Sequence, residues 1–181
     1  ELDDGTILFG EKTIDLPRQH RDQKIKRVWL QPKVKANPDA VEALESADVI
    51  IFGPGDLYTS IMPNLYVTGI IGAIKNSGAR LIYIANIMTK HSETHGFGVT
   101  DFTAVLEGVL PRPIDTVIYN TQHISPQLLR AYALDRAYPV GVEGVLPDWC
   151  GRPVLSTSSG LARHDSQKLA KAVKDVVEHH A

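Results

Sequence analysis

The chain has 181 residues, a length that fits one domain with a single substantial hydrophobic core. Hydrophobic residues make up 43% of it and charged residues 22%, as in soluble globular proteins, and its apolar runs end well before the ~20 residues that cross a bilayer. The formal charge of −2 gives no overall positive potential that would attract nucleic acid, so we expect no nucleic-acid binding. The single cysteine, Cys150, allows no intrachain disulfide, which fits a reducing cytoplasm. We therefore expect a cytoplasmic protein without membrane insertion.

The first 32 residues predict short strands and a polar linker. Residues 2–16 alternate loosely between apolar and polar side chains, which predicts short strands or a hairpin. Residues 18–27 are polar and basic and favour a solvated linker, and residues 28–30 are a further strand candidate before Pro32. Because the chain begins at Glu1 and not at methionine, we also expect a fragment of a longer protein.

Beyond this point helices and strands are predicted to alternate. Residues 38–46 carry apolar side chains at helical spacing, and residues 48–52 form a continuous β-rich run, typical of a strand buried on both faces of a parallel sheet. We expect further helices at 64–76, 99–108, 126–136 and 165–178, strands at 80–85, 115–119 and 139–142, and a loop at 143–153. This alternation predicts a single α/β domain with a mostly parallel sheet.

In open parallel sheets, ligands bind beyond the carboxyl ends of the strands, which directs attention to three loops. The first follows the strand at 48–52. Its Gly53 and Gly55 allow close backbone approach, and hydroxyls follow at Tyr58, Thr59 and Ser60 before Asn64 opens a helix. The pattern fits a phosphate cradle as well as it fits a tight turn whose hydroxyls only cap the helix.

The second loop, after residue 85, gathers an amide, hydroxyls, an amine, a carboxylate and two imidazoles. These side chains belong to Asn86, Thr89, Lys90, His91, Ser92, Glu93, Thr94 and His95, with Met88 among them. Lys90 could neutralise a phosphate, and Glu93 or Asp101 could hold a hard cation such as Mg²⁺. A solvated loop with a helix cap at Thr100 or Asp101 is the alternative.

A zinc site at the two histidines of this loop is not favoured. His91 and His95 have a spacing that binds metal only on a helix, and the nearby Gly96 and Gly98 argue against a helix.

The third loop, residues 120–125, has donors and acceptors suited to a base or a sugar, although Ser125 would equally cap the following helix. Near the end of the chain, Arg163 would reach a ligand phosphate, or Asp165 would simply cap the last helix.

Residues 47–65, which contain the Gly-Pro-Gly-Asp-Leu-Tyr-Thr-Ser loop, closely resemble the signature of the bacterial gluconeogenesis-factor (YvcK-like) family, which is related to the 2-phospho-L-lactate transferases (CofD-like). The resemblance extends through residues 83–89, 93–96, Asp101 and 163–165, and covers almost the whole chain. It does not include the glycine-rich phosphate loop with which members of the family begin. We therefore expect the C-terminal portion of a longer Rossmann-like protein, with an open sheet and helices on both faces.

The resemblance implies a nucleotide or nucleotide-sugar ligand. In the regulatory branch that ligand is a UDP-sugar, and the protein influences carbon metabolism, cell shape and cell-wall synthesis. The alternative is a Mg²⁺-dependent transferase of a phospholactyl group, in which Asn86, Thr89 and Glu93 would position the substrate and the cation. The sequence of residues 57–65 favours the regulatory branch. We assign no catalytic residue, and Mg²⁺ is the one cofactor that the resemblance suggests. We expect a homodimer, from the resemblance and from the apolar region around Leu146 and Trp149, which we expect to be exposed.

The chain departs from the pattern of the family at three places. Asp56 stands where relatives usually have serine, His91-Ser92 replaces Pro-Gly, and His95 replaces an acidic residue. These changes alter the carboxylates of the expected site, and they put inherited metal binding and catalysis in doubt.

Overall fold

The computed structural model describes residues 1–17 and 19–178. Its helices are α1 (Glu11–Asp15), α2 (Pro38–Glu45), η1 (Leu57–Ile61), α3 (Met62–Leu65), α4 (Ile70–Asn76), α5 (His91–Thr94), α6 (Val99–Glu107), α7 (Pro126–Leu134) and α8 (Ser166–Glu178). Its strands are β1 (Val49–Phe52), β2 (Arg80–Ile84), β3 (Thr116–Asn120), β4 (Cys150–Arg152), β5 (Leu155–Ser156) and β6 (Arg163–His164). None of these helices is long and apolar enough to cross a membrane.

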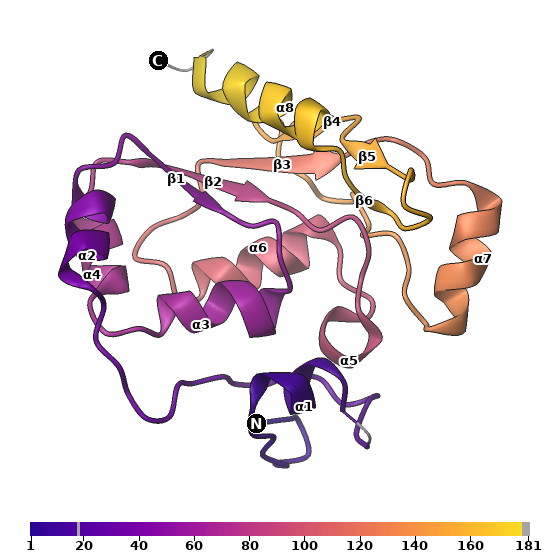
Figure 1. The fold of residues 1–181 in the computed structure, drawn as a ribbon, viewed down its shortest axis with the longest axis horizontal. Coiled ribbons are helices and arrows are strands. Elements are labelled where there is room, and N and C mark those ends of the chain that lie inside the picture. Colours follow the sequence, from indigo (N-terminus) through magenta and orange to yellow (C-terminus); the bar gives the residue numbers. More distant parts are fainter. Residues whose placement is uncertain (18, 179–181) are drawn as a thin grey trace.

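The centre of the molecule is a four-stranded sheet in the order β1-β2-β3-β4, and all three pairings are parallel (Figure 1). In register, Ile51 lies opposite Ile82, and Ile118 lies opposite Cys150. All four strands therefore end at the same edge of the sheet. The short strands β5 and β6 form a separate antiparallel pair that leads into α8.

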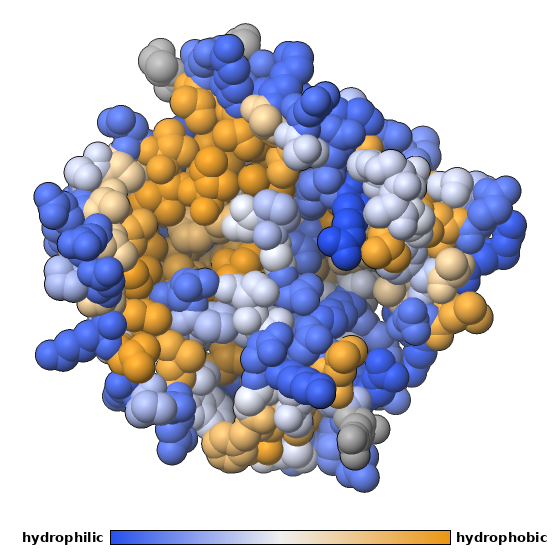
Figure 2. Space-filling model, in the orientation of Figure 1, coloured by the Kyte–Doolittle hydropathy of each residue, from blue (hydrophilic) through white to orange (hydrophobic). Residues whose placement is uncertain are grey.

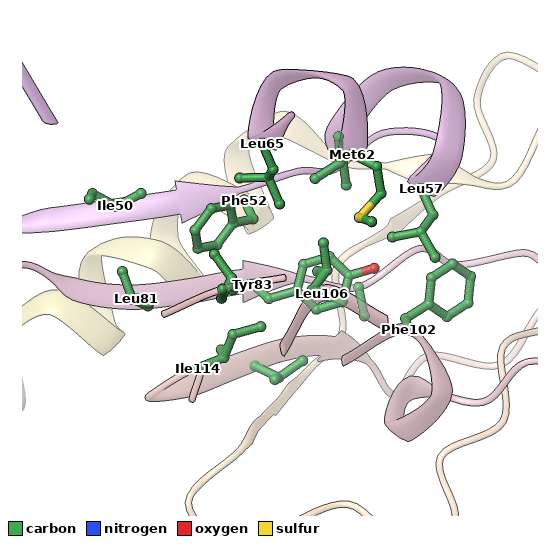
Figure 3. Packing of buried hydrophobic residues seen from close by; sticks show 14 of the residues in the cluster. Ile50, Phe52, Leu57, Met62, Leu65, Leu81, Tyr83, Phe102, Leu106 and Ile114 are labelled. Atoms are coloured by element: carbon green, nitrogen blue, oxygen red, sulfur yellow. The ribbon is translucent and has the colours of Figure 1, made fainter. Parts of the chain in front are cut away.

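Helices cover both faces of the sheet. Alternate side chains of each strand point to opposite faces, and apolar side chains on both faces are buried under these helices. On one face, Leu81 and Tyr83 of β2 pack in a core with side chains from α3 and α6 (Figure 3). On the other face, Ile82 and Ile84 pack against α8. Burial on both faces explains the continuous apolar run of β2, and the arrangement confirms the expected α/β class.

Coverage of the second face is incomplete at β1. Ile51 projects to the same face as Ile82, yet its side chain is 42% exposed, and within the described sheet β1 pairs only with β2. Beside it, Ile84 and the α8 residues Leu169, Val173 and Val177 line a shallow apolar surface. Figure 2 shows apolar side chains gathered in this region, below α8. The sheet thus ends in a partly bare edge strand.

Most of the predicted helices and strands from residue 38 onward are confirmed, with one helix divided. The segment predicted as a helix over 64–76 forms α3 and α4, separated at Gly69, whose φ of 110° lies in the left-handed region that interrupts a helix.

The prediction of strands over residues 2–16 and 28–30 is wrong. Residues 11–15 form α1, and Leu2 makes only an isolated bridge with Ile25. The main-chain hydrogen bonds between residues 1–3 and 24–27 are too few to form a ladder. Instead α1 lies over α5 and η1, on the side of the sheet where the strands end.

The strand predicted at 139–142 is also absent. This segment pairs with the loop after β2 through isolated bridges, and Pro139 has no N–H to offer a sheet. The fourth strand is instead β4, inside the predicted loop of 143–153. Trp149, expected to be exposed, packs partly against the core, whereas Leu146 is exposed.

Candidate functional site

The loop after β1 turns sharply at a glycine that no other residue could replace without strain. Gly53 has a φ of 80°, and a Cβ at this position would lie 3.0 Å from the main-chain oxygen of Ile84 and 3.3 Å from Cδ1 of Ile61. Close backbone approach to the end of β2 is therefore the reason for this glycine.

The loop continues into a single wide turn of π-helix, η1. The N–H groups of Ser60 and Ile61 both donate to the main-chain oxygen of Asp56, at 2.9 and 3.0 Å. The turn buries Tyr58, leaves Ser60 exposed and half-buries Thr59. Segments of π-helix are rare and frequently lie at functional sites.

Four residues predicted to bind ligand line one groove beside β1. Gly53, Gly55, Ser60 and Asn64 surround a cavity of about 400 Å³ together with apolar side chains of β1 and α4. The side-chain amide of Asn64 donates to the main-chain oxygen of Ser60 at 2.7 Å, which fixes this wall of the groove. Tyr58 and Thr59 lie on the other side of the turn, where they line a separate cavity of about 300 Å³ with the N-terminal segment.

Next to η1, the ammonium group of Lys90 lies among three carboxylates. Its Nζ is 2.9 Å from Oδ2 of Asp56 and 3.2 Å from Oε1 of Glu93, and it makes a closer contact with Asp15. These groups come from the end of α1, the loop before η1, and α5 with its N-cap. The hydroxyl of Thr59 also faces Glu93, with Oγ1 3.5 Å from Oε1. Lys90 was predicted to neutralise a ligand phosphate. The three carboxylates compete with such a phosphate for its ammonium group.

Two carboxylates of this cluster have a raised pKa, chiefly because they are buried. Burial raises the pKa of Glu93 and the charge of Asp56 raises it further, whereas Lys90 lowers it. The pKa of Asp56 is raised by burial and then by the charge of Glu11. Burial also raises the pKa of Tyr58 to about 12, so its phenol stays protonated near neutral pH.

Several buried polar atoms near the carboxyl end of β2 have no hydrogen-bond partner among the described residues. They are the hydroxyl of Tyr83, Oδ1 of Asn86, Oε2 of Glu93, Nδ1 of His95 and Nε2 of His164. His164 belongs to β6 but hydrogen-bonds the main chain of Ala85, which brings it to the end of β2. Unpartnered buried groups are costly unless water or a ligand satisfies them, so this edge is where we expect a polar ligand.

Residues 1–157 of this chain match the sequence family described as 2-phospho-L-lactate transferase CofD. The chain belongs to the CofD family. The chain is 37% identical over 184 residues to the gluconeogenesis factor of Halalkalibacterium halodurans, and the match covers 96% of the chain and 55% of that protein. It is 33% identical over 190 residues to the gluconeogenesis factor of Bacillus subtilis, covering 98% of this chain and 57% of that protein.

A solved structure supports the same relationship. A crystal structure of a protein from Bacillus halodurans matches with a TM-score of 0.85 and 36% sequence identity, over 95% of this chain and 57% of that one. This chain therefore spans a little more than half the length of each of these three proteins, and its fold is that of the family.

Two of the predicted site residues have structural partners instead of an open face. Thr89 is buried, its N–H donates to the main-chain oxygen of Tyr138 at 2.7 Å, and its Oγ1 accepts the N–H of Tyr138 at 3.0 Å. Met88 forms an isolated bridge with Pro139. Both residues thus hold the segment after α7 against the loop after β2.

Other predicted polar residues lie apart from the Lys90 cluster. Arg163 is exposed on β6, paired with Ser156. Ser125 caps α7 by accepting the N–H of Leu128 at 3.3 Å, so the capping alternative for this residue is confirmed. Asp101 accepts the N–H of Gly98 at 2.7 Å at the start of α6.

The two histidines of the second loop lie side by side. Contrary to the argument from Gly96, residues 91–94 are helical, because α5 ends before the glycine. The rings of His91 and His95 have centroids 5.2 Å apart, and Nε2 of His91 lies 3.1 Å from Oδ1 of Asp22. Within residues 1–17 and 19–178, the one group of metal-ligating side chains is Asp15, Asp56 and Glu93.

Sequence reasoning missed Asp15 and His164 as members of this edge. Asp15 is 75 positions from Lys90 in the chain, and His164 reaches Ala85 from β6. No local pattern signals either contact. Asp56 did carry a signal, because it interrupts a loop otherwise suited to an anion.

Proposed function

We propose that this chain binds a nucleotide sugar, specifically a UDP-sugar, at the carboxyl edge of its parallel sheet, and that it acts in the regulation of carbon metabolism. The regulation of cell shape and cell-wall synthesis, implied by the resemblance of residues 47–65, belongs to the same proposal. The observation that carries it is the set of unpartnered polar groups at the end of β2, above all Oδ1 of Asn86 and Nε2 of His164.

The chemistry of these two groups suits a base or a sugar. Burial lowers the pKa of His164, so its ring is neutral at pH 7 and Nε2 can meet a neutral polar group. The amide of Asn86 offers both a donor and an acceptor. Ligands of open parallel sheets bind at this edge, and the groove lined by Gly53, Gly55 and Ser60 begins at the same end of β1.

Two features support binding over group transfer. As long as no cation replaces it, Lys90 is paired with three carboxylates, and the N–H and the hydroxyl oxygen of Thr89 are each bonded to the main chain of Tyr138. A transferase would need such groups to stabilise the charge that develops on the transferred phosphate. The relatives are gluconeogenesis factors, a name that points to carbon metabolism.

The second candidate is a Mg²⁺-dependent transferase of a phosphorus-containing group. It is favoured by the description of the matching family and by the acidic cluster of Asp15, Asp56 and Glu93. The resemblance to the 2-phospho-L-lactate transferases implies a guanine nucleotide for such an enzyme, whereas the leading proposal requires a uridine nucleotide. The identity of the base therefore separates the two.

The test is isothermal titration of the protein with UDP-N-acetylglucosamine, UDP-glucose, GDP and GTP. We expect saturable binding of a UDP-sugar, and we expect Asn86→Ala to weaken it by about 1 to 3 kcal/mol because a ligand group loses its buried partner. The matched control is Asn76→Ala, which removes an exposed amide at the end of α4 and should leave affinity unchanged. Binding of guanine nucleotides without any response to UDP-sugars would refute the proposal.

A further inference from the structure

We propose that the carboxylates of Asp15, Asp56 and Glu93 form a binding site for one hard divalent cation, which competes with the ammonium group of Lys90 for the same position. The inference stands on side-chain geometry and does not depend on whether a nucleotide sugar binds.

The geometry of the carboxylates suits such an ion. One oxygen from each of Asp15, Asp56 and Glu93 lies within 4.8 Å of the others. Mg²⁺ takes oxygen ligands at about 2.1 Å and Ca²⁺ at about 2.4 Å, so opposite ligands of one ion are roughly 4 to 5 Å apart. Thr59 places a hydroxyl beside the site, 3.5 Å from Oε1 of Glu93. Three carboxylates from separate parts of the chain therefore converge at the spacing of one coordination sphere.

The unused oxygen of Glu93 is the independent sign of a missing partner. Its side chain is only 1% exposed, and its carboxylate is directed into the cluster, with Oε1 3.2 Å from Nζ of Lys90. Its Oε2 is buried and has no hydrogen-bond partner among the residues the structure describes. A buried carboxylate with an unsatisfied oxygen is costly, and a cation that bound both oxygens would remove that cost.

The three carboxylates of the cluster need more than one positive charge to balance them. Three carboxylates face a single ammonium group, and Glu11 adds its negative charge to the surroundings of Asp56. A divalent ion in place of the ammonium would balance the cluster more fully, and hard cations prefer carboxylate oxygens.

The side chain of Lys90 can leave the site without breaking the main-chain hydrogen bonds of α5. Its side chain is 30% exposed, and α5, which follows it, is fixed independently by the N–H groups of Glu93 and Thr94, which donate to the main-chain oxygen of Lys90. The ammonium group would move into solvent when the ion enters. Lys90 thus acts as a tethered competitor that sets the cation concentration at which the site fills.

The experiment is isothermal titration of the protein with MnCl₂ and with MgCl₂, without nucleotide. We expect one equivalent of metal per chain. Lys90→Met should bind the ion at least about tenfold more tightly, because it removes a competing positive charge a few ångströms away. Asp15→Asn and Asp56→Asn should each weaken binding by at least about tenfold, because each removes one charged ligand. Asp148→Asn is the matched control, since Asp148 is exposed and lies outside the cluster.

Thermal unfolding provides a second readout in case a variant folds poorly. The protein with Lys90→Met should unfold at a lower temperature than the unaltered protein without metal, and MnCl₂ should stabilise it more than it stabilises the unaltered protein. The proposal is overturned if no variant shows saturable binding, if Lys90→Met fails to tighten it, or if Asp15→Asn leaves it unchanged.

Discussion

Replacement of Gly53 by alanine tests whether the loop after β1 depends on its left-handed backbone. The φ of 80° at this position costs an L-residue about 1 to 2 kcal/mol. The new Cβ would also lie 3.0 Å from the main-chain oxygen of Ile84, which the sheet holds in place. Alanine restricts the unfolded chain and offsets about 0.4 to 1 kcal/mol of this cost, which leaves up to about 1.6 kcal/mol from φ alone, and with the close contact added we expect a net loss of about 1 to 2 kcal/mol.

Urea unfolding followed by circular dichroism measures this loss, which corresponds to a fall in Tm of roughly 2 to 8 °C for a chain of this length. Gly78→Ala is the matched control, because Gly78 is exposed, has an ordinary φ and has open space where the Cβ would lie. That variant should be as stable as the unaltered protein or slightly more stable. If Gly53→Ala were equally stable, the argument from close backbone approach would be wrong.

Two further predictions concern pH and the core. Burial lowers the folded-state pKa of His164 below its ordinary 6.5, so its contribution to stability is fully present above pH 6.5 and is lost as the pH falls below that value. His164→Gln should therefore lose less unfolding free energy between pH 7 and pH 5 than the unaltered protein, and equal losses would contradict the assignment. Phe102→Ala should cost about 3 to 5 kcal/mol in urea unfolding, because this ring is fully buried against Phe97. Phe9→Ala, at an exposed ring, should change stability by less than about 0.5 kcal/mol.

The strands at the centre of the sheet could be predicted from sequence because their physical cause is local. Residues 80–84 are apolar on both faces, and a run of this kind indicates a strand covered by helices on each side. The caps of α2 and α7 were equally readable, since Asn37 and Ser125 accept hydrogen bonds from N–H groups two and three residues ahead. The cap contacts lie within three residues, and the signal for the strand lies within one short apolar run.

The remaining features depend on contacts that no local pattern contains. β4 has only three residues, including Gly151, and it becomes a strand because β3 supplies the ladder. Residues 139–142 have the composition of a strand but pair with the loop after β2. In the site, Asp15 contacts Lys90, which is 75 positions away in the chain. The cluster of Lys90 and its carboxylates could therefore not be predicted from the spacing of residues.

The bare edge at β1 affects the environment of the loop that follows it. A further strand parallel to β1 would extend the sheet without moving β2 or β3, and would pair with the main-chain groups along the open side of β1. The carboxyl end of that strand would bring its own loop to the far side of Gly53 and Ser60. The groove beside β1 would then be bordered by loops from two neighbouring strands.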